Sequence, residues 1–204
     1  MIISHKYKFI FIKTLKTAGT SIEVDLNNHL GPEDISTPIY PKVDGHIPRN
    51  YKNKFFKKDF INHMTACEVI EYIGIDTFKN YFSFCVEREP VDKCISHYSM
   101  LKNSPYHRSD KTISFNDYIN DGIFPNDVAK YTSEDGKLLV DKIIKYENLK
   151  QELQDVSKII GLDFVLQSRV KSGFRENINI TKTQKKTIYK SFSDSLIYTG
   201  YKFT

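Results

Sequence analysis

The feature that most constrains this chain of 204 residues is a β-rich run that passes into a helix through a glycine-containing turn. Residues 7–13, YKFIFIK, predict a strand, and a helix is expected from about Thr20 to Leu30, where a Gly-Pro dipeptide ends it. The turn TLKTAGTS (14–21) lies between them. This order is typical of phosphate-binding loops, because a helix N-terminus presents unpaired N–H groups to an anion.

The lysine of this turn precedes the glycine in the sequence, whereas the lysine of a Walker loop follows it. The Walker pattern GxxxxGK[ST] places lysine after the last glycine, whereas Lys16 comes three residues before Gly19. We expect the backbone N–H groups around 18–21 to hold an anion, with Lys16 on the rim. Three hydroxyl side chains add donors: Thr17, Thr20 and Ser21. An ordinary βα turn with a threonine N-cap is the alternative interpretation.

Apolar strands and helical segments alternate along the rest of the chain. Further strands are expected over 60–63, 81–87 and 137–146, and further helices over 65–74, 91–102, 115–121, 147–160 and 182–193. This alternation predicts an α/β fold with a parallel sheet, whose ligand sites lie beyond the carboxyl ends of the strands. Residues 1–204 are expected to form one domain, with 31–58 as a long surface excursion.

A second stretch of interest, REPVDKCISHY (88–98), follows the strand predicted at 81–87. Arg88 comes directly after the strand, and Ser96 lies about two turns into the next helix. The two side chains are expected to grip one phosphate from two sides, since the arginine fork matches phosphate geometry. The alternative is that Arg88 pairs with the neighbouring Glu87 or Glu89.

A third candidate is His63, predicted at a strand end just before a capped helix. A neutral imidazole there can act as a general base at pH 7. His46 and His97 are rival candidates for this role.

Composition narrows the class of partner. The net charge of +5 suits an anionic ligand, but the basic residues are scattered, so no nucleic-acid partner is expected. Three cysteines without metal-ligand spacing favour a reducing cytoplasm and no metal site. No apolar stretch reaches the ~20 residues of a membrane span.

Taken together, these stretches resemble the sulfotransferases that use 3′-phosphoadenosine 5′-phosphosulfate (PAPS), in their carbohydrate branch of heparan and chondroitin type. KTAGTS (16–21) is similar to the PKTAGTS loop for the 5′-phosphosulfate, and Arg88-x-Pro90…Ser96-x-Tyr98 is similar to the 3′-phosphate motif R-x-P-x-x-R-x-x-S-x-Y. IIKYENLKQEL and the ending YTGYKF resemble later segments of the same branch.

Three positions depart from the family pattern. Leu15 stands where proline is usual, Lys93 replaces the second arginine of the 3′-phosphate motif, and Lys145 replaces the arginine of the RyEnL segment. The exchange at Lys93 keeps the charge and loses the bidentate fork.

The resemblance implies a three-layer α/β sandwich around a central parallel β-sheet, the P-loop-NTPase-like sulfotransferase fold. It implies PAPS as the donor, with its 5′-phosphosulfate on the 16–21 loop and its 3′-phosphate on Arg88 and Ser96. The implied donor-binding residues are Lys16, Thr17, Ala18, Gly19, Thr20, Ser21, Arg88 and Ser96, with Lys171, Ser172 and Arg175 closing over the nucleotide.

The same resemblance implies two catalytic residues and no metal. Lys16 would stabilise the bridging oxygen as the S–O bond breaks, and His63 would take the proton of the acceptor hydroxyl. The product would be 3′-phosphoadenosine 5′-phosphate, and the acceptor a glycan or another hydroxyl compound bound beside 31–58. The membrane anchor of the Golgi members is not seen, so a bacterial or viral cytoplasmic enzyme, or an excised catalytic domain, is expected.

Two other functions remain open at this point. One is a P-loop-type nucleotide kinase or phosphotransferase, which would use Mg²⁺ and a lysine after the glycines. The other is a non-catalytic nucleotide-binding module, which would not need both Lys16 and His63.

Overall fold

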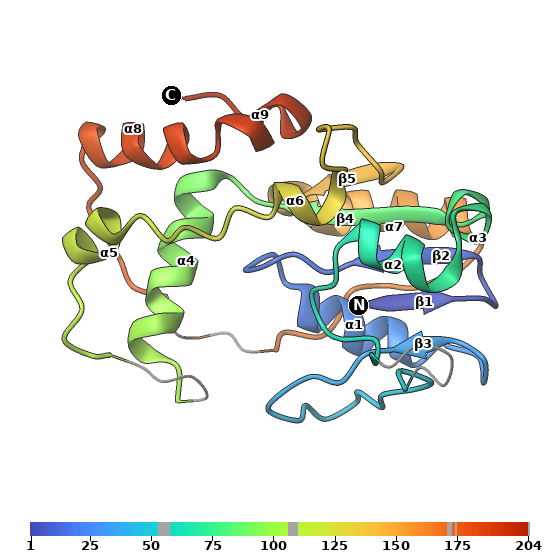
Figure 1. The fold of residues 1–204 in the computed structure, drawn as a ribbon. Coiled ribbons are helices and arrows are strands. Elements are labelled where there is room, and N and C mark those ends of the chain that lie inside the picture. Colours follow the sequence, from blue (N-terminus) through green and yellow to red (C-terminus); the bar gives the residue numbers. More distant parts are fainter. Residues whose placement is uncertain (53–57, 106–109, 171–172, 174, 204) are drawn as a thin grey trace.

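The computed structural model describes residues 1–52, 58–105, 110–170, 173 and 175–203. Within these residues the centre of the molecule is a five-stranded sheet of order β3-β1-β2-β4-β5 (Figure 1). The strands are β1 (Ile2–Ser4), β2 (Phe9–Ile12), β3 (Ile35–Ser36), β4 (Phe82–Glu87) and β5 (Lys142–Lys145). The expected α/β class is confirmed.

The sheet is mixed, so the expectation of a parallel sheet is correct only for its centre. β2, β4 and β5 run parallel to one another, whereas β1 is antiparallel to both β2 and β3. The strand expected over 7–13 corresponds to β2. It forms a hairpin with β1, which the sequence did not predict. Its turn passes through Lys8, which has a positive φ of 52° without being a glycine, and so the sequence carries no turn signal there.

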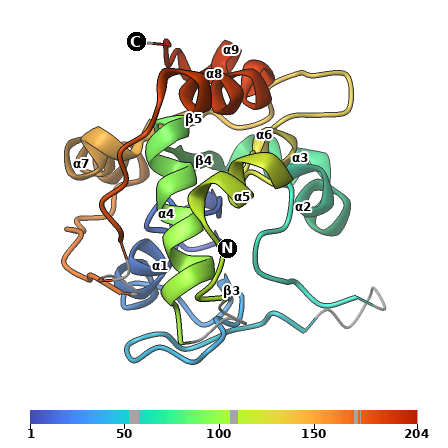
Figure 2. The same ribbon diagram turned by 90° about the vertical axis from the view of Figure 1, so that its left-hand side faces the viewer.

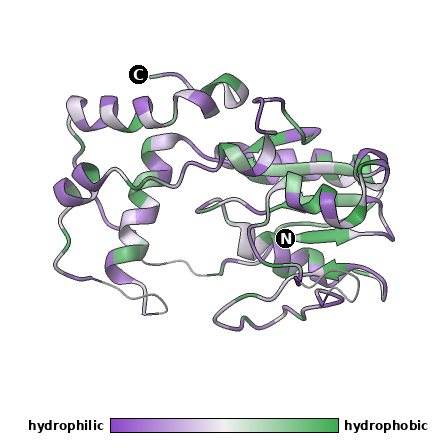
Figure 3. Ribbon diagram, in the orientation of Figure 1, coloured by the Kyte–Doolittle hydropathy of each residue, from purple (hydrophilic) through white to green (hydrophobic). Residues whose placement is uncertain are grey.

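Helices cover both faces of the sheet. Figure 2 shows α1 (Gly19–Asn27) and α7 (Leu149–Ile160) on one side of the strands, and α2 (Ala66–Ile73) and α3 (Ile75–Asn80) on the other. Because strand side chains alternate between faces, Phe9 and Phe11 pack with α1 and α7, and Ile10 and Ile12 pack with α2 and α3. The strands are correspondingly green in the hydropathy colouring of Figure 3.

A third apolar cluster holds the helices that stand away from the sheet. α4 (Pro90–Asn103) leaves the end of β4 and packs against α5 (Phe115–Asp121) and α8 (Lys182–Ser191). The remaining helical elements are α6 (Val128–Tyr131), the 3₁₀ turn η1 (Tyr146–Asn148) and α9 (Ser193–Thr199). Among the described residues, no helix is long and apolar enough to cross a membrane.

The predicted helix starts are mostly correct and some of the strands are not. Side chains cap α2, α5 and α8 in complete capping boxes, as the spacing indicated. The strand expected over 60–63 is wrong: this segment ends in a turn, and His63 has a φ of 64°, which an extended strand does not allow. The strand expected over 137–146 is shortened to β5.

Candidate functional site

The loops that follow β2 and β4 open on one cavity of about 990 Å³. The whole 14–21 turn lines it, together with His63, Arg88, Ser96 and Arg175. The structure thus brings together predicted residues from four separate parts of the chain. Lys171 and Ser172 lie outside the described residues.

The turn at the end of β2 takes its shape from two residues that are not glycine. Lys16 and Ala18 both have a φ of 62°, in the left-handed region that costs an L-residue about 1–2 kcal/mol. Gly19 has another role: a Cβ there would lie 2.7 Å from Cγ of Lys13. Gly19 makes room for the Lys13 stem, whose buried ammonium pairs with Glu23. Gly19 itself is not among the glycines with a positive φ, so the shape of the turn does not depend on a left-handed glycine.

The start of α1 has no side-chain cap, in contrast to α2, α5 and α8. Its N-cap residue is Ala18, and Gly19, Thr20 and Ser21 form its first turn. The N–H groups of a first helical turn have no acceptor within the helix. They therefore offer donors at the cavity wall, where the helix dipole also favours an anion.

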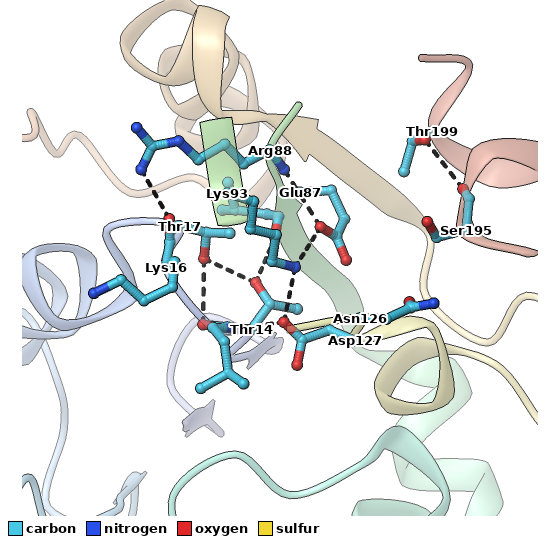
Figure 4. Close-up of polar contacts among 12 residues, drawn as sticks. Thr14, Lys16, Thr17, Glu87, Arg88, Lys93, Asn126, Asp127, Ser195 and Thr199 are labelled. Carbon is cyan, nitrogen blue, oxygen red and sulfur yellow. Dashed lines mark hydrogen bonds and ion pairs between the residues drawn. The ribbon is translucent and has the colours of Figure 1, made fainter. Parts of the chain in front are cut away.

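The three hydroxyls of the turn are placed differently. Thr17 is buried, and its hydroxyl lies 2.8 Å from that of Thr14, which in turn donates to the carbonyl of Val86 (Figure 4). Ser21 accepts a bond of 3.0 Å from the backbone N–H of Val170. Thr14 therefore ties the turn to β4 and Thr17 supports it, and Thr20 is the partly exposed hydroxyl of the three.

Arg88 joins three parts of the cavity wall. Its guanidinium donates to the carbonyl of Lys16 at 3.1 Å and lies 4.0 Å from the centroid of the Tyr146 ring. It also forms an ion pair with Asp92 in the first turn of α4, and not with Glu87 or Glu89, the acids named in the alternative interpretation. Arg175 pairs with the same carboxylate, so Asp92 links the two cations.

α4 contributes more to the cavity than the sequence indicated. Ser96 lines it as expected, and so do Ser99 and Met100, which lie three and four residues further on the same helix face. Lys93 does not line it: its side chain is fully buried and pairs with Glu87 and Asp127. Helical spacing alone could have found Ser99 and Met100.

Two further parts of the wall were missed. η1 with the start of α7, and the segment 166–170, both line the cavity. The first carries Tyr146, within the segment IIKYENLKQEL that had drawn attention only as a resemblance. The second is an irregular segment without periodicity, and its sequence offered no signal.

His63 is the one candidate histidine that lines the cavity in the described part of the chain. Its Nδ1 lies 3.0 Å from the carbonyl oxygen of Lys13. A carbonyl can only accept, so Nδ1 carries the hydrogen and Nε2 keeps its lone pair. Burial, reinforced by the charge of Lys13, lowers the pKa of His63 to about 4, and the ring is neutral at pH 7.

The two rival histidines have other partners. His46 lies 3.0 Å from the hydroxyl of Ser36, and His97 lies 3.1 Å from the hydroxyl of Tyr118. No described residue of 31–58 lines the cavity. The excursion packs beside α1, where Asn27 bonds to Ser36 and Ile47.

Among the described residues no group of three or more histidine, cysteine, aspartate or glutamate side chains could hold a metal ion. The cations on the cavity wall are side chains of the described residues: Lys13, Lys16, Arg88, Lys150, Arg169 and Arg175.

Fold and site together define an α/β protein with a cavity at the carboxyl ends of its parallel strands. No family model matches the chain, and no solved structure matches it. A protein of Archaeoglobus fulgidus, described as an uncharacterized protein, is 31% identical over 120 residues, which cover 56% of this chain and 96% of the archaeal protein. The chain belongs to the same family as that archaeal protein.

Proposed function

We propose that the protein is a sulfotransferase that transfers a sulfuryl group from PAPS to a hydroxyl acceptor, on a three-layer sulfotransferase fold of the P-loop-NTPase type. The observation that carries this proposal is the single cavity on which Lys16, His63 and Arg88 converge from three segments. Its volume of about 990 Å³ is that of a site for a ligand of nucleotide size.

The donor set on the cavity wall fits a nucleotide with two separate anionic groups. The uncapped start of α1, with Lys16 beside it, suits the 5′-phosphosulfate. Arg88, Ser96 and Arg175 suit the 3′-phosphate, because a guanidinium fork and a hydroxyl both donate to phosphate oxygens. The carboxylate of Asp92 holds both arginines in place, and an incoming phosphate would share them with it.

Each catalytic residue has a defined task. His63 accepts the acceptor's proton at Nε2, since its Nδ1–H is held by the Lys13 carbonyl. Lys16 neutralises the charge that develops on the bridging oxygen. When bound, PAPS supplies the sulfuryl group: the acceptor oxygen bonds to sulfur, the bond from sulfur to the 5′-phosphate oxygen breaks, and that oxygen keeps the electron pair.

We assign the acceptor to the class of carbohydrate hydroxyls, on the resemblance to the carbohydrate branch. The acceptor would approach on the side of His63, where the ammonium of Lys130 lies 3.3 Å from the His63 carbonyl. The positive charge at this edge suits an acidic sugar.

Calorimetry with non-reactive nucleotides tests the proposal. We expect adenosine 3′,5′-bisphosphate to bind without Mg²⁺ and more tightly than ADP or ATP. Arg88→Lys should weaken this binding by about 10-fold, because lysine cannot make the bidentate contact. Asp163→Ala, an exposed change outside the cavity lining, serves as the control.

The same titrations distinguish the other functions. Tighter binding of ATP with Mg²⁺ than of the bisphosphate would contradict a sulfotransferase and favour a nucleotide kinase. Tight bisphosphate binding without any transfer from PAPS to a panel of glycans and small alcohols would favour a non-catalytic binding module.

A further inference from the structure

A buried cluster of charged side chains lies directly beneath the 14–21 turn. It consists of Glu87 at the end of β4, Lys93 in α4, and Asp127 just before α6, each no more than 2% exposed (Figure 4). Nζ of Lys93 donates to Oε2 of Glu87 at 2.7 Å and to Oδ2 of Asp127 at 2.8 Å. None of the three lines the cavity, and the proposed chemistry does not use them.

Asp127 reaches from this cluster to the backbone of the turn. Its Oδ2 accepts a hydrogen bond of 2.7 Å from the N–H of Leu15, which lies 112 residues away in the chain. Leu15 immediately precedes Lys16, where the backbone enters the left-handed region with a φ of 62°. The carboxylate thus fixes the chain at the point where its direction changes.

The charges of the cluster show that Asp127 is not needed merely to neutralise Lys93. Glu87 alone would balance the single buried ammonium, and a second buried carboxylate is costly to desolvate. Burial raises the pKa of Glu87, and the charge of Asp127 raises it further. Nζ of the partly exposed Lys130 lies 3.7 Å from Oδ1 of Asp127 and offsets part of the excess negative charge. Because a second buried carboxylate is costly, we look for a structural role for Asp127, and its hydrogen bond from the Leu15 amide is such a role.

We propose that Asp127 is a positioning residue: held by Lys93, it fixes the Leu15 amide and thereby sets the place of the Lys16 side chain in the cavity. Its effect on transfer rests on the proposed function, whereas its effect on the loop backbone does not. Asp127 acts through Leu15 and touches no reacting atom.

Asp127→Ala tests the proposal by two readouts. We expect amide hydrogen exchange of Leu15 and Lys16 to rise at least about 10-fold while exchange in β2 and β4 stays unchanged, because only the tether to the turn is lost. We expect kcat to fall by about 100-fold, with a much smaller change in the affinity for adenosine 3′,5′-bisphosphate. The reason is that a displaced Lys16 side chain affects the rate of transfer more than nucleotide binding.

A second substitution separates positioning from general stability. Leu15→Pro removes the N–H that needs an acceptor and restricts φ to about −65°. In the Asp127→Ala background it should restore part of kcat, which a merely destabilised protein would not show. If Asp127→Ala does not fold, Asp127→Asn keeps the shape with a weaker acceptor and should give a smaller rise in Leu15 exchange.

The outcomes are distinct. Unchanged Leu15 exchange and unchanged kcat in Asp127→Ala would overturn the proposal, and so would faster exchange spread evenly over β2 and β4. If the wild-type protein shows no transfer at all, the proposed function fails, and Leu15 exchange alone then decides the role of Asp127. Asp163→Ala, which removes an exposed carboxylate, is the control for net charge.

Discussion

At the scale of the residue, His63 combines a constrained backbone with a defined tautomer. It lies in the left-handed region, it donates from Nδ1 to the Lys13 carbonyl at 3.0 Å, and burial lowers its pKa to about 4. Lys16 and Ala18, which also line the cavity, share the left-handed backbone. Strained residues of this kind gather at functional sites, where the surrounding structure holds them.

The residue-scale prediction concerns His63→Asn. Asparagine tolerates a positive φ and can donate from its amide to the Lys13 carbonyl, so the fold should be kept while the base is lost. We expect kcat to fall by about 10²- to 10⁴-fold with little change in bisphosphate affinity, as measured by transfer assays and calorimetry. Full activity in this variant would move the base to another residue.

The lowered pKa of His63 also has a consequence for pH. The unfolded histidine titrates near 6.5 and the folded one near 4, so the unfolded state binds the extra proton between these values. His63 therefore contributes stability above pH 6.5 that is lost as the pH falls toward 4, by at most about 1.4 kcal/mol per pH unit. Denaturant titrations should show a shallower acid loss in His63→Asn, and kcat/KM of the wild type should stay flat to about pH 5.

Sequence reasoning selected Lys16 and Arg88 because each follows a strand, and Ser96 because it lies on the helix after Arg88. His63 was selected from a strand end that the structure does not contain, although its side chain does line the cavity. Sequence reasoning did not predict the structural roles of Gly19 and Thr17. These roles depend on contacts with the side chains of Lys13 and Thr14, which only the folded turn brings about. The partner of Arg88 was likewise misjudged, since Asp92 reaches it only once α4 has formed.

At the scale of the element, α1 fastens the irregular segment 166–170 to the cavity wall. Asp25 accepts hydrogen bonds from the N–H groups of Gln167 at 2.7 Å and Ser168 at 2.9 Å, and a further one from the Ser168 hydroxyl. Ser21 adds the bond from Val170. A segment without regular structure is thus ordered by two side chains of one helix.

The element-scale prediction is that Asp25→Ala loosens this segment. Loss of three bonds to a charged acceptor should raise amide exchange over 166–170 and weaken bisphosphate binding by about 10-fold. The melting temperature should change little, because Asp25 is not part of the apolar core that holds α1 to the sheet and Leu166 keeps its own contact with that core. Asp163→Ala is the matched control, and equal exchange in the two variants would contradict the prediction.

Local signals predicted helices better than strands. Capping boxes marked α2, α5 and α8 because the cap is a contact between residues three apart. β1 and β3 have three and two residues, too few for a period-2 pattern, and they are strands only because they pair across the chain. α9 follows the helix expected over 182–193 and was not itself expected from the sequence.

At the scale of the whole molecule, the parallel centre of the sheet brings the turns after β2 and β4 to one edge. The alternation of strands and helices was enough to predict that these turns meet at one edge, where the cavity lies. It could not predict the antiparallel β1 and β3, because the direction of a short strand is set by tertiary pairing.

The whole-molecule prediction is that bisphosphate stabilises the folded chain. At 100 times its Kd, a ligand bound only by the folded state adds about 2.7 kcal/mol, which corresponds to a rise in Tm of roughly 5–10 °C for a domain of this size. The rise should persist in a chelator, and AMP, which lacks one phosphate, should give a smaller one. No rise at saturating bisphosphate would argue against the two-part anion site.

The contact between Lys13 and Gly19 has a consequence for how relatives of this protein can vary. The stem of Lys13 occupies the space that a Cβ at position 19 would need, so the residue at one position limits the size of the residue at the other. A relative with alanine or serine at position 19 should carry a smaller residue at position 13. Covariation between these two positions would be the evolutionary trace of a lysine lying beneath the turn.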